Sequence, residues 1–184
     1  MEKGMKRITV STLLLTVLFS LIYANTHISM TFPLAITFGT TFYHFGMRLL
    51  IGGVFDKCMK NKADYSKKWY QLRIWEMSLY DKLKVKKWKN KMPTYKPELL
   101  SPKEHTWDEI AQAMCQAELV HETIIIFSFV PILFSMIWGT FWVFFITSIL
   151  AALFDLSFVI MQRYNRPRVV KIALKEKGNE KYKK

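Results

Sequence analysis

The sequence contains few of the residues and motifs that mark small disulfide-rich domains and common soluble enzymes. Among its 184 residues are two cysteines, seven glycines and six prolines. With so few cysteines, nothing favours a disulfide framework. There is no repeat of fixed period, no glycine-rich phosphate loop, no Gly-x-Ser-x-Gly turn and no His-x-x-x-x-Asp pair. These absences weigh against repeat proteins, nucleotide-binding folds and the usual soluble hydrolases and acyltransferases.

Long apolar runs are present instead, and they are separated from the basic segments. Hydrophobic residues make up 51% of the chain, and apolar windows of about 20 residues are long enough for a helix to cross the hydrocarbon. The pattern predicts a single all-α membrane domain, residues 1–184, with four transmembrane helices. Their expected ranges are about 8–25, 30–55, 119–137 and 140–161.

The positive charge predicts the orientation of these helices. Of the 27 Lys and Arg residues, 14 fall in the segment 56–118 and nine follow the last apolar run. By the positive-inside rule, both termini, this basic segment and the basic tail 169–184 are cytoplasmic. The chain is expected to be a multi-pass protein of a bacterial plasma membrane. Its first apolar run lacks a convincing cleavage site, so we expect it to be retained. Anionic lipid headgroups account for the basic residues, so no nucleic-acid partner is expected.

The basic segment is expected to contain an amphipathic helix in the headgroup plane. One face of this helix carries apolar side chains at spacings of three and four residues, with cations around the rest. Those residues are Trp69, Leu72, Trp75, Leu79 and Leu83. Further on, Thr106 and Glu109 fit a capping box and predict the start of a helix that continues to Phe127.

Ionisable residues inside the apolar runs are the candidates for a functional site, because each costs about 2.5 to 3.5 kcal/mol at the membrane centre. They gather at one depth, toward the cytoplasmic ends of three helices. They are His44, Arg48, Glu118, His121, Glu122, Asp155 and Arg163.

Several of these residues also have a purely structural interpretation. Arg48 can form a buried ion pair with Asp155 or Glu122, and His44 can be a packed histidine. Glu118 and His121 can be an ordinary helix end at the interface. Their spacing matches half of a carboxylate-bridged metal site, but no second pair exists, so no metal is expected. Cys115 is expected to be a buried, inert thiol rather than an acyl carrier.

Two short motifs resemble a known family of membrane enzymes. The runs "AELVH", residues 117–121, and "QRYNRPR", residues 162–168, together with "KKWYQLRIWE" in the basic segment, resemble the glycosyl-4,4'-diaponeurosporenoate acyltransferase family. The resemblance covers roughly residues 65 to 170. It implies a membrane acyltransferase related to carotenoid biosynthesis, although nothing in the sequence itself indicates a carotenoid substrate.

The leading hypothesis is therefore acyl transfer to a hydroxyl of a glycolipid or similar amphiphile at the cytoplasmic leaflet. His121, oriented by Glu118, would act as the general base, and Asn165 would donate a hydrogen bond to the oxyanion. Arg163 and Arg166 would hold phosphate groups of an acyl-CoA or acyl-carrier-protein donor. The remaining substrate-binding candidates are His44, Arg48, Glu122 and Asp155. No tightly bound cofactor is expected, and the sequence leaves the oligomeric state open.

The alternative hypothesis is a non-catalytic protein that binds lipid headgroups or a partner membrane enzyme. In that case the arginines are interfacial anchors. Pro167 biases the preceding residue away from helix, so the last transmembrane helix is expected to end around Asn165. The resulting bend would turn Arg166 toward Glu118 and His121, and leave Arg168 among the headgroups.

Overall fold

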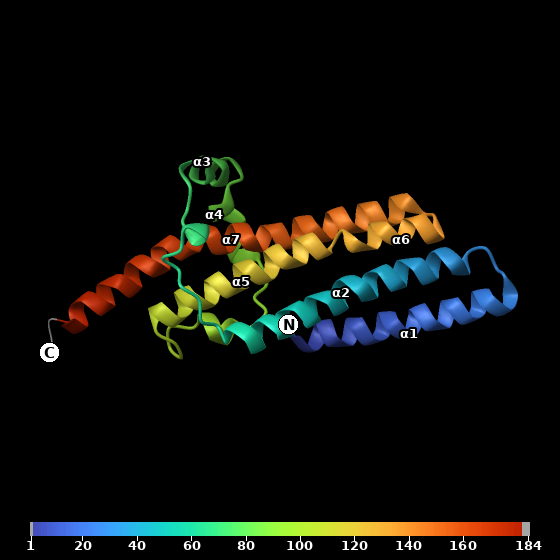
Figure 1. Ribbon diagram of the computed structural model, residues 1–184, viewed down its shortest axis with the longest axis horizontal. Helices are drawn as coiled ribbons and strands as arrows, with labels where there is room; N and C mark the ends of the chain where they lie inside the picture. The colour runs from blue at the N-terminus through green and yellow to red at the C-terminus, as the bar shows by residue number, and fades with distance from the viewer. Residues whose placement is uncertain (1, 182–184) are drawn as a thin grey trace. The chain divides into compact units, whose positions relative to one another are not determined.

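The computed structural model describes residues 2–181, and within that range it consists of helices and connecting turns without a β-strand (Figure 1). The predicted all-α class is confirmed. The last three residues of the expected basic tail, 182–184, lie outside the described residues. In chain order the elements are α1 (Glu2–Thr26), α2 (Thr31–Met59), η1 (Lys68–Tyr70), α3 (Ile74–Lys82), α4 (Val85–Trp88), η2 (Lys89–Lys91), η3 (Pro97–Leu100), α5 (Trp107–Phe127), α6 (Val130–Trp138) and α7 (Phe141–Lys181).

Three stretches of helix are long and apolar enough to cross a membrane. They are Glu2–Thr26, the α5–α6 stretch Trp107–Trp138, and Phe141–Gly178. Many of their large apolar side chains are exposed, as expected for helices that meet lipid. These features indicate a membrane-associated protein. The fourth expected span corresponds to α2, which is not among the three, so a four-span topology stays a prediction.

The described chain divides into two compact units. The first unit comprises Met1–Gly53 and Thr123–Asp155, and the second comprises Val54–Glu122 and Leu156–Lys184.

In the first unit, α1 and α2 run antiparallel and approach closely through small residues (Figure 1). A Cβ placed on Gly39 would lie 3.4 Å from Thr16, and one placed on Gly46 would lie 3.7 Å from Thr9. The rings of Phe19 and Phe38 stack at 5.5 Å. Glycine and threonine therefore set the distance between these two helices, as small residues do between helices in membranes.

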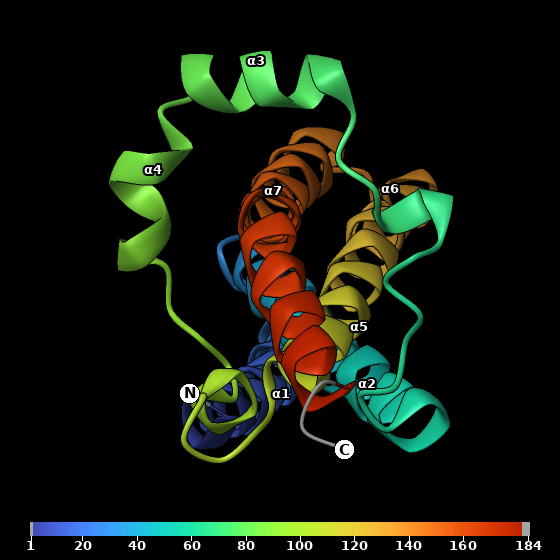
Figure 2. The same ribbon diagram turned by 90° about the vertical axis from the view of Figure 1, so that its left-hand side faces the viewer.

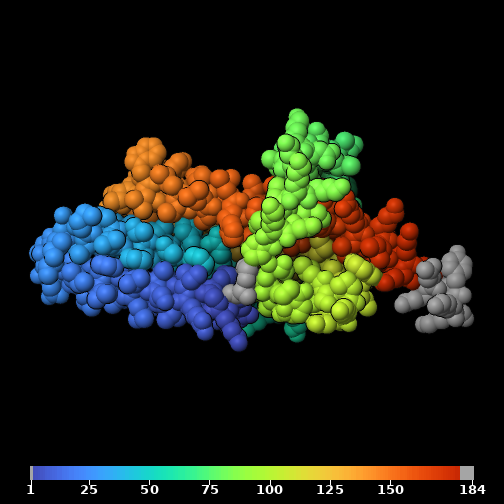
Figure 3. Space-filling view, turned by 180° about the vertical axis from the view of Figure 1, so that it is seen from behind, coloured from blue at the N-terminus to red at the C-terminus, as the bar shows by residue number. Residues whose placement is uncertain are grey.

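In the second unit, the segment that carries α3 and α4 arches around α7 (Figure 2). Figure 3 shows the same segment in green against the orange-red part of α7. α3 directs Glu76 and Tyr80 inward, whereas Ile74 is 90% exposed and Trp75 is 58% exposed. The apolar side of α3 therefore faces outward and a carboxylate faces inward.

The expected continuous amphipathic helix from Trp69 to Leu83 is not present. Residues 68–70 form a single 3₁₀ turn, and the α-helix spans only Ile74–Lys82. The physical reason lies in the backbone carbonyls of Trp69, Tyr70 and Gln71, which accept hydrogen bonds from arginine side chains of α7. Because these carbonyls bond to side chains, a regular helix does not form there.

The predicted start of α5 is confirmed. The backbone N–H of Thr106 donates to Glu109 Oε2 at 2.9 Å, and the backbone N–H of Glu109 donates to Thr106 Oγ1 at 3.2 Å. These are the two reciprocal bonds of a capping box. α5 ends at Phe127, and α6 begins at Val130 with Pro131 in its first turn, so the span expected over 119–137 is divided between two helices. Pro131 has no backbone N–H to donate to the carbonyl of Phe127, and this carbonyl accepts from the Tyr43 hydroxyl at 2.9 Å.

The expected end of the last helix around Asn165 is wrong, because α7 continues through Pro167 to Lys181. Proline removes one helical hydrogen bond, to the carbonyl of Arg163, but contacts on both sides hold the helix straight enough to continue. Arg163 and Arg166 are tied to carboxylates before the proline. After it, Ala173 is buried and Lys177 bonds to Asp108 at 2.6 Å.

Candidate functional site

A buried ion network lies at the centre of the second unit, and Arg163 is its main donor. The Arg163 Nε and Nη2 atoms donate to Glu76 at 3.2 and 2.8 Å, and its Nη1 atom donates to Glu118 at 2.6 Å. The carbonyls of Trp69 and Gln71 accept from Arg163 at 3.0 and 3.1 Å. An arginine has five N–H donors, so every donor of Arg163 is used within the protein.

Arg166 and Glu118 complete this network. Glu118 is fully buried, and its second carboxylate oxygen accepts from Arg166. Arg166 also donates to the carbonyl of Tyr70 and lies 5.2 Å from the centre of the Tyr70 ring. Burial is the main cause that raises the pKa of Tyr70 to about 12, so its hydroxyl stays neutral at physiological pH.

The network is balanced in charge, with two arginines and two glutamates. We call these four residues, Glu76, Glu118, Arg163 and Arg166, the closed network. A buried ion pair is costly unless its remaining donors and acceptors are also satisfied, and here backbone carbonyls satisfy them. The closed network joins residues 69–76 to α5 and α7, so it fixes the arch of the second unit.

His121 and Glu122 lie beside the closed network, both half-buried. The His121 ring stacks on Phe158, with ring centres 4.6 Å apart and planes 5° from parallel. Glu122 Oε2 accepts from the indole N–H of Trp69 at 3.0 Å. The imidazole and the carboxylate are therefore each held by an aromatic side chain.

Of the two partners expected for Glu118, Arg166 is found beside it, whereas the bonds of its carboxylate go to arginines. Both of its oxygens bond to arginines, so the carboxylate that was expected to orient His121 is engaged with Arg163 and Arg166. Likewise, a phosphate could contact Arg163 only if that arginine gave up an internal bond. The catalytic role of His121 stays a prediction. Cys115, three residues before Glu118 on α5, is fully buried, in line with an inert thiol.

The other three candidate residues, His44, Arg48 and Asp155, lie in the first unit. Arg48 forms an ion pair with Asp155, the pairing expected under the structural interpretation, and donates to the carbonyls of His44 at 2.9 Å and Ala151 at 3.3 Å. Four buried polar atoms here have no hydrogen-bond partner among the described residues: Nδ1 and Nε2 of His44, Nε of Arg48 and Oγ of Ser148. This buried pair is therefore less completely satisfied than the closed network.

Asn165 lies with Arg168, which was expected among the headgroups, and with Lys89 and Tyr164, which the sequence did not single out. Lys89 donates to Asn165 Oδ1, and its ammonium lies 5.1 Å from the centre of the Tyr164 ring. Arg168 lies 5.2 Å from the same ring. We call these four residues, Lys89, Tyr164, Asn165 and Arg168, the open cluster. The amide oxygen of Asn165 accepts a hydrogen bond from Lys89, so Asn165 lies among charged side chains.

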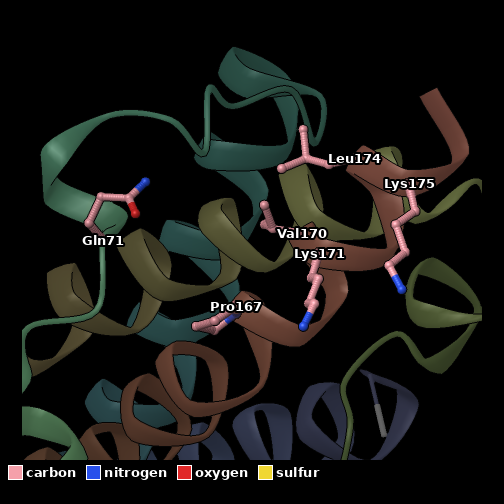
Figure 4. Close-up of a pocket in the computed structure, with 6 residues that line it drawn as sticks. All are labelled: Gln71, Pro167, Val170, Lys171, Leu174 and Lys175. Carbon is pink, nitrogen blue, oxygen red and sulfur yellow. The ribbon is translucent and has the colours of Figure 1, made fainter. Parts of the chain in front are cut away.

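A shallow pocket of about 460 Å³ lies further along α7 (Figure 4). Pro167, Val170, Lys171, Leu174 and Lys175 line it from α7, and Gln71 lines it from the facing segment. Both lysines are exposed. The pocket combines apolar and cationic groups. Exposed lysines on a helix surface are common, so this lining alone does not indicate a ligand.

Comparison with known proteins identifies the family. The family model of glycosyl-4,4'-diaponeurosporenoate acyltransferase matches residues 66–175, which is more than half of the chain. The chain belongs to this acyltransferase family. The match includes the closed network, His121 and the open cluster, and it confirms the resemblance seen in the sequence. No curated protein and no solved structure matches the chain significantly.

Sequence reasoning missed two residues that the structure places at the centre of these clusters. Glu76 reads as one charge among many in a basic amphipathic segment, and Lys89 as one of six lysines between residues 82 and 91. Glu76 gave one weak signal, since it is the first acidic residue of a short helix within a region of high positive charge. Nothing distinguished Lys89 from its neighbours.

Proposed function

We propose that this membrane protein transfers a fatty acyl group to a hydroxyl of a glycolipid or another amphiphilic acceptor at the cytoplasmic leaflet. The family match over residues 66–175 carries the proposal, because the family is named for an acyltransferase. The basic second unit and the apolar helices support an acceptor whose tail lies in lipid and whose head lies at the interface.

The proposed reaction forms one bond and breaks one. The acceptor hydroxyl oxygen attacks the carbonyl carbon of an activated acyl group, a thioester, so that an ester C–O bond forms and the C–S bond breaks. His121 takes the hydroxyl proton as the oxygen attacks and then returns it to the leaving thiolate. An imidazole suits both steps because it can accept a proton at one stage and return it at the next.

The surroundings of His121 support this role. Its ring is fixed in plane against Phe158, and it follows Glu118 by three residues on the same helix. Because the closed network is saturated, the helix that carries His121 is held rigidly. A catalytic group on a rigid element keeps its geometry better than one on a loop.

The proposed acyl donor is a cytosolic acyl-CoA or acyl-carrier-protein thioester, and no tightly bound cofactor takes part. A cytosolic donor agrees with the predicted cytoplasmic position of the basic segment. The acceptor is proposed only as a class, because the residues beside His121 indicate no particular sugar or pigment.

Acyl transfer in membranes that contain His121→Ala tests the proposal. The assay follows a labelled acyl chain from acyl-CoA into lipid-soluble ester. Loss of a general base typically lowers the rate by about 10²- to 10⁴-fold. His105→Ala is the matched control, because His105 lies in the same unit but outside the site. Full transfer by a folded His121→Ala protein would refute the base assignment.

The proposed leaflet can be tested with natural and introduced thiols. Cys58 is exposed and lies in the basic segment. A membrane-impermeant maleimide should label it only after the cells are permeabilised. A Ser29→Cys substitution, in the turn between α1 and α2, should be labelled in intact cells. The reverse pattern would move the site to the outer leaflet.

A second candidate function is non-catalytic binding of a lipid or partner enzyme. One observation favours it: all five donors of Arg163 are used internally, so the arginine first expected to hold the acyl donor is part of the fold. Under this alternative, no acyl transfer is detected with any candidate acceptor, and His121→Ala leaves the lipid composition of the cell unchanged.

A further inference from the structure

The open cluster places two cations around one aromatic ring. Lys89 and Arg168 lie 5.1 and 5.2 Å from the centre of the Tyr164 ring, and Arg168 also donates to the Tyr164 hydroxyl at 3.5 Å. Asn165 accepts from Lys89 on the same side of α7. The Tyr80 ring packs edge-on against the Tyr164 ring, with ring centres 6.2 Å apart.

These two cations differ from four cations of the second unit that carboxylates hold in place. Arg163, Arg166, Lys96 and Lys177 each form an ion pair with a carboxylate. Lys89 and Arg168 form no ion pair with any side chain that the structure describes. The open cluster therefore brings two cations to one aromatic ring without a carboxylate partner among the described side chains.

The electrostatics of Lys89 indicate that this gathering is unfavourable in the protein alone. Burial is the largest cause that lowers the pKa of Lys89, followed by the charges of Arg168 and Lys86. A cation–π contact at an exposed site is a weak attraction. A cation–π contact needs only one cation, so it does not by itself explain why two cations share the Tyr164 ring or why Asn165 holds Lys89 in place.

We propose that Lys89, Asn165 and Arg168 bind a phosphate group. The ammonium of Lys89 supplies a point charge, the guanidinium of Arg168 a planar pair of donors, and the amide of Asn165 a neutral donor. An anionic phosphate would supply the counter-charge that the cluster lacks. Tyr164 then serves as the surface that positions both cations.

The position on α7 narrows the source of the phosphate to two. The apolar run ends at Met161, and the cluster begins within one turn, at the depth expected for lipid headgroups. The phosphate therefore belongs either to an anionic phospholipid of the membrane or to a phosphorylated acyl donor. The proposal concerns binding and does not rest on acyl transfer.

Binding to the full-length protein distinguishes the two sources. Free coenzyme A, titrated by calorimetry into protein in a neutral detergent, reports a donor phosphate. Retention of phosphatidylglycerol from phosphatidylcholine nanodiscs, measured by native mass spectrometry, reports a headgroup phosphate. In the arm that matches the true source, Lys89→Gln and Arg168→Gln should each weaken binding about tenfold, as the loss of one charge-assisted hydrogen bond does.

The pocket lysines supply a matched control. Lys171→Gln and Lys175→Gln remove the same charge from the same helix, outside the open cluster, and should change binding less than twofold. The proposal is overturned if neither ligand binds more weakly to the cluster variants, or if the pocket variants weaken binding as much. Because Arg168 is exposed, its variant should fold normally, which an unchanged melting temperature would verify. Binding can fail while acyl transfer persists, so the two proposals are separable.

Discussion

Three arginines lie on two opposite faces of α7 within six residues of one another. Arg163 and Arg166 face inward and are paired with Glu76 and Glu118. Arg168 faces outward, near Lys89, with no carboxylate partner among the described side chains. The closed network uses its charge to hold the fold, whereas the open cluster keeps its charge available.

This difference shows that the surroundings of an arginine, more than its place in a motif, decide its role. On a helix, residues three apart share a face, so 163 and 166 turn inward together. Residues 164, 165 and 168 fall on the other side. The closed face meets α5 and residues 69–76, which supply carboxylates and carbonyls. The open face meets Lys89 of η2.

The largest expected effect comes from Glu118→Gln, which leaves two buried guanidinium groups with one carboxylate. Breaking a buried ion pair on one side typically costs about 3 to 5 kcal/mol. Unfolding of the detergent-solubilised protein, followed by tryptophan fluorescence, measures the change. Glu122→Gln, one turn further on and bonded to Trp69, is the control and should cost far less. Equal effects would mean that the network does not hold the fold.

A smaller loss is expected for Glu76→Gln. Arg163 keeps Glu118 and both carbonyls in this variant, so about 1 to 3 kcal/mol should be lost. Glu98→Gln removes a carboxylate from an exposed position in the same unit and should change nothing. Proteolysis of the arch should accelerate in Glu76→Gln alone. If it does not, Glu76 is not the residue that fastens α3.

Pro167→Ala should change stability in the opposite direction. α7 is continuous at this position, so alanine can supply the N–H that proline lacks and bond to the Arg163 carbonyl. We expect a gain of about 1 kcal/mol, since proline is among the costliest residues in a helix interior. A loss of stability would show that the proline shapes the two faces of the helix.

The smallest expected effect on stability belongs to Lys89→Gln. Substitutions at partly exposed sites without a buried partner usually stay within about 0.5 kcal/mol. The folded-state pKa of Lys89 lies below its unfolded value, so stability rises as pH climbs between the two values. That rise should be absent in Lys89→Gln when unfolding is measured across alkaline pH. An unchanged pH profile would place its cause elsewhere.

The sequence predicted the helical class, the capping box at Thr106 and an ion pair of Arg48 with either Asp155 or Glu122, of which the structure shows Asp155. Each of these depends on local spacing or on the cost of charge in an apolar run. It did not predict that residues 69–71 leave the helix or that α7 passes through Pro167. The first depends on arginines far along the chain, whose bonds outweigh local helix preference. The second depends on tertiary contacts that hold α7 on both sides of the proline. Glu76 was missed for the same reason, because only the folded chain brings Arg163 to it.

The most direct test compares Arg163→Gln with Arg168→Gln in thermal unfolding of the full-length protein. Both variants remove one positive charge from α7, five residues apart. If α7 carries a closed and an open face, Arg163→Gln lowers the melting temperature sharply and Arg168→Gln leaves it unchanged. Equal melting temperatures for the two variants would contradict that division.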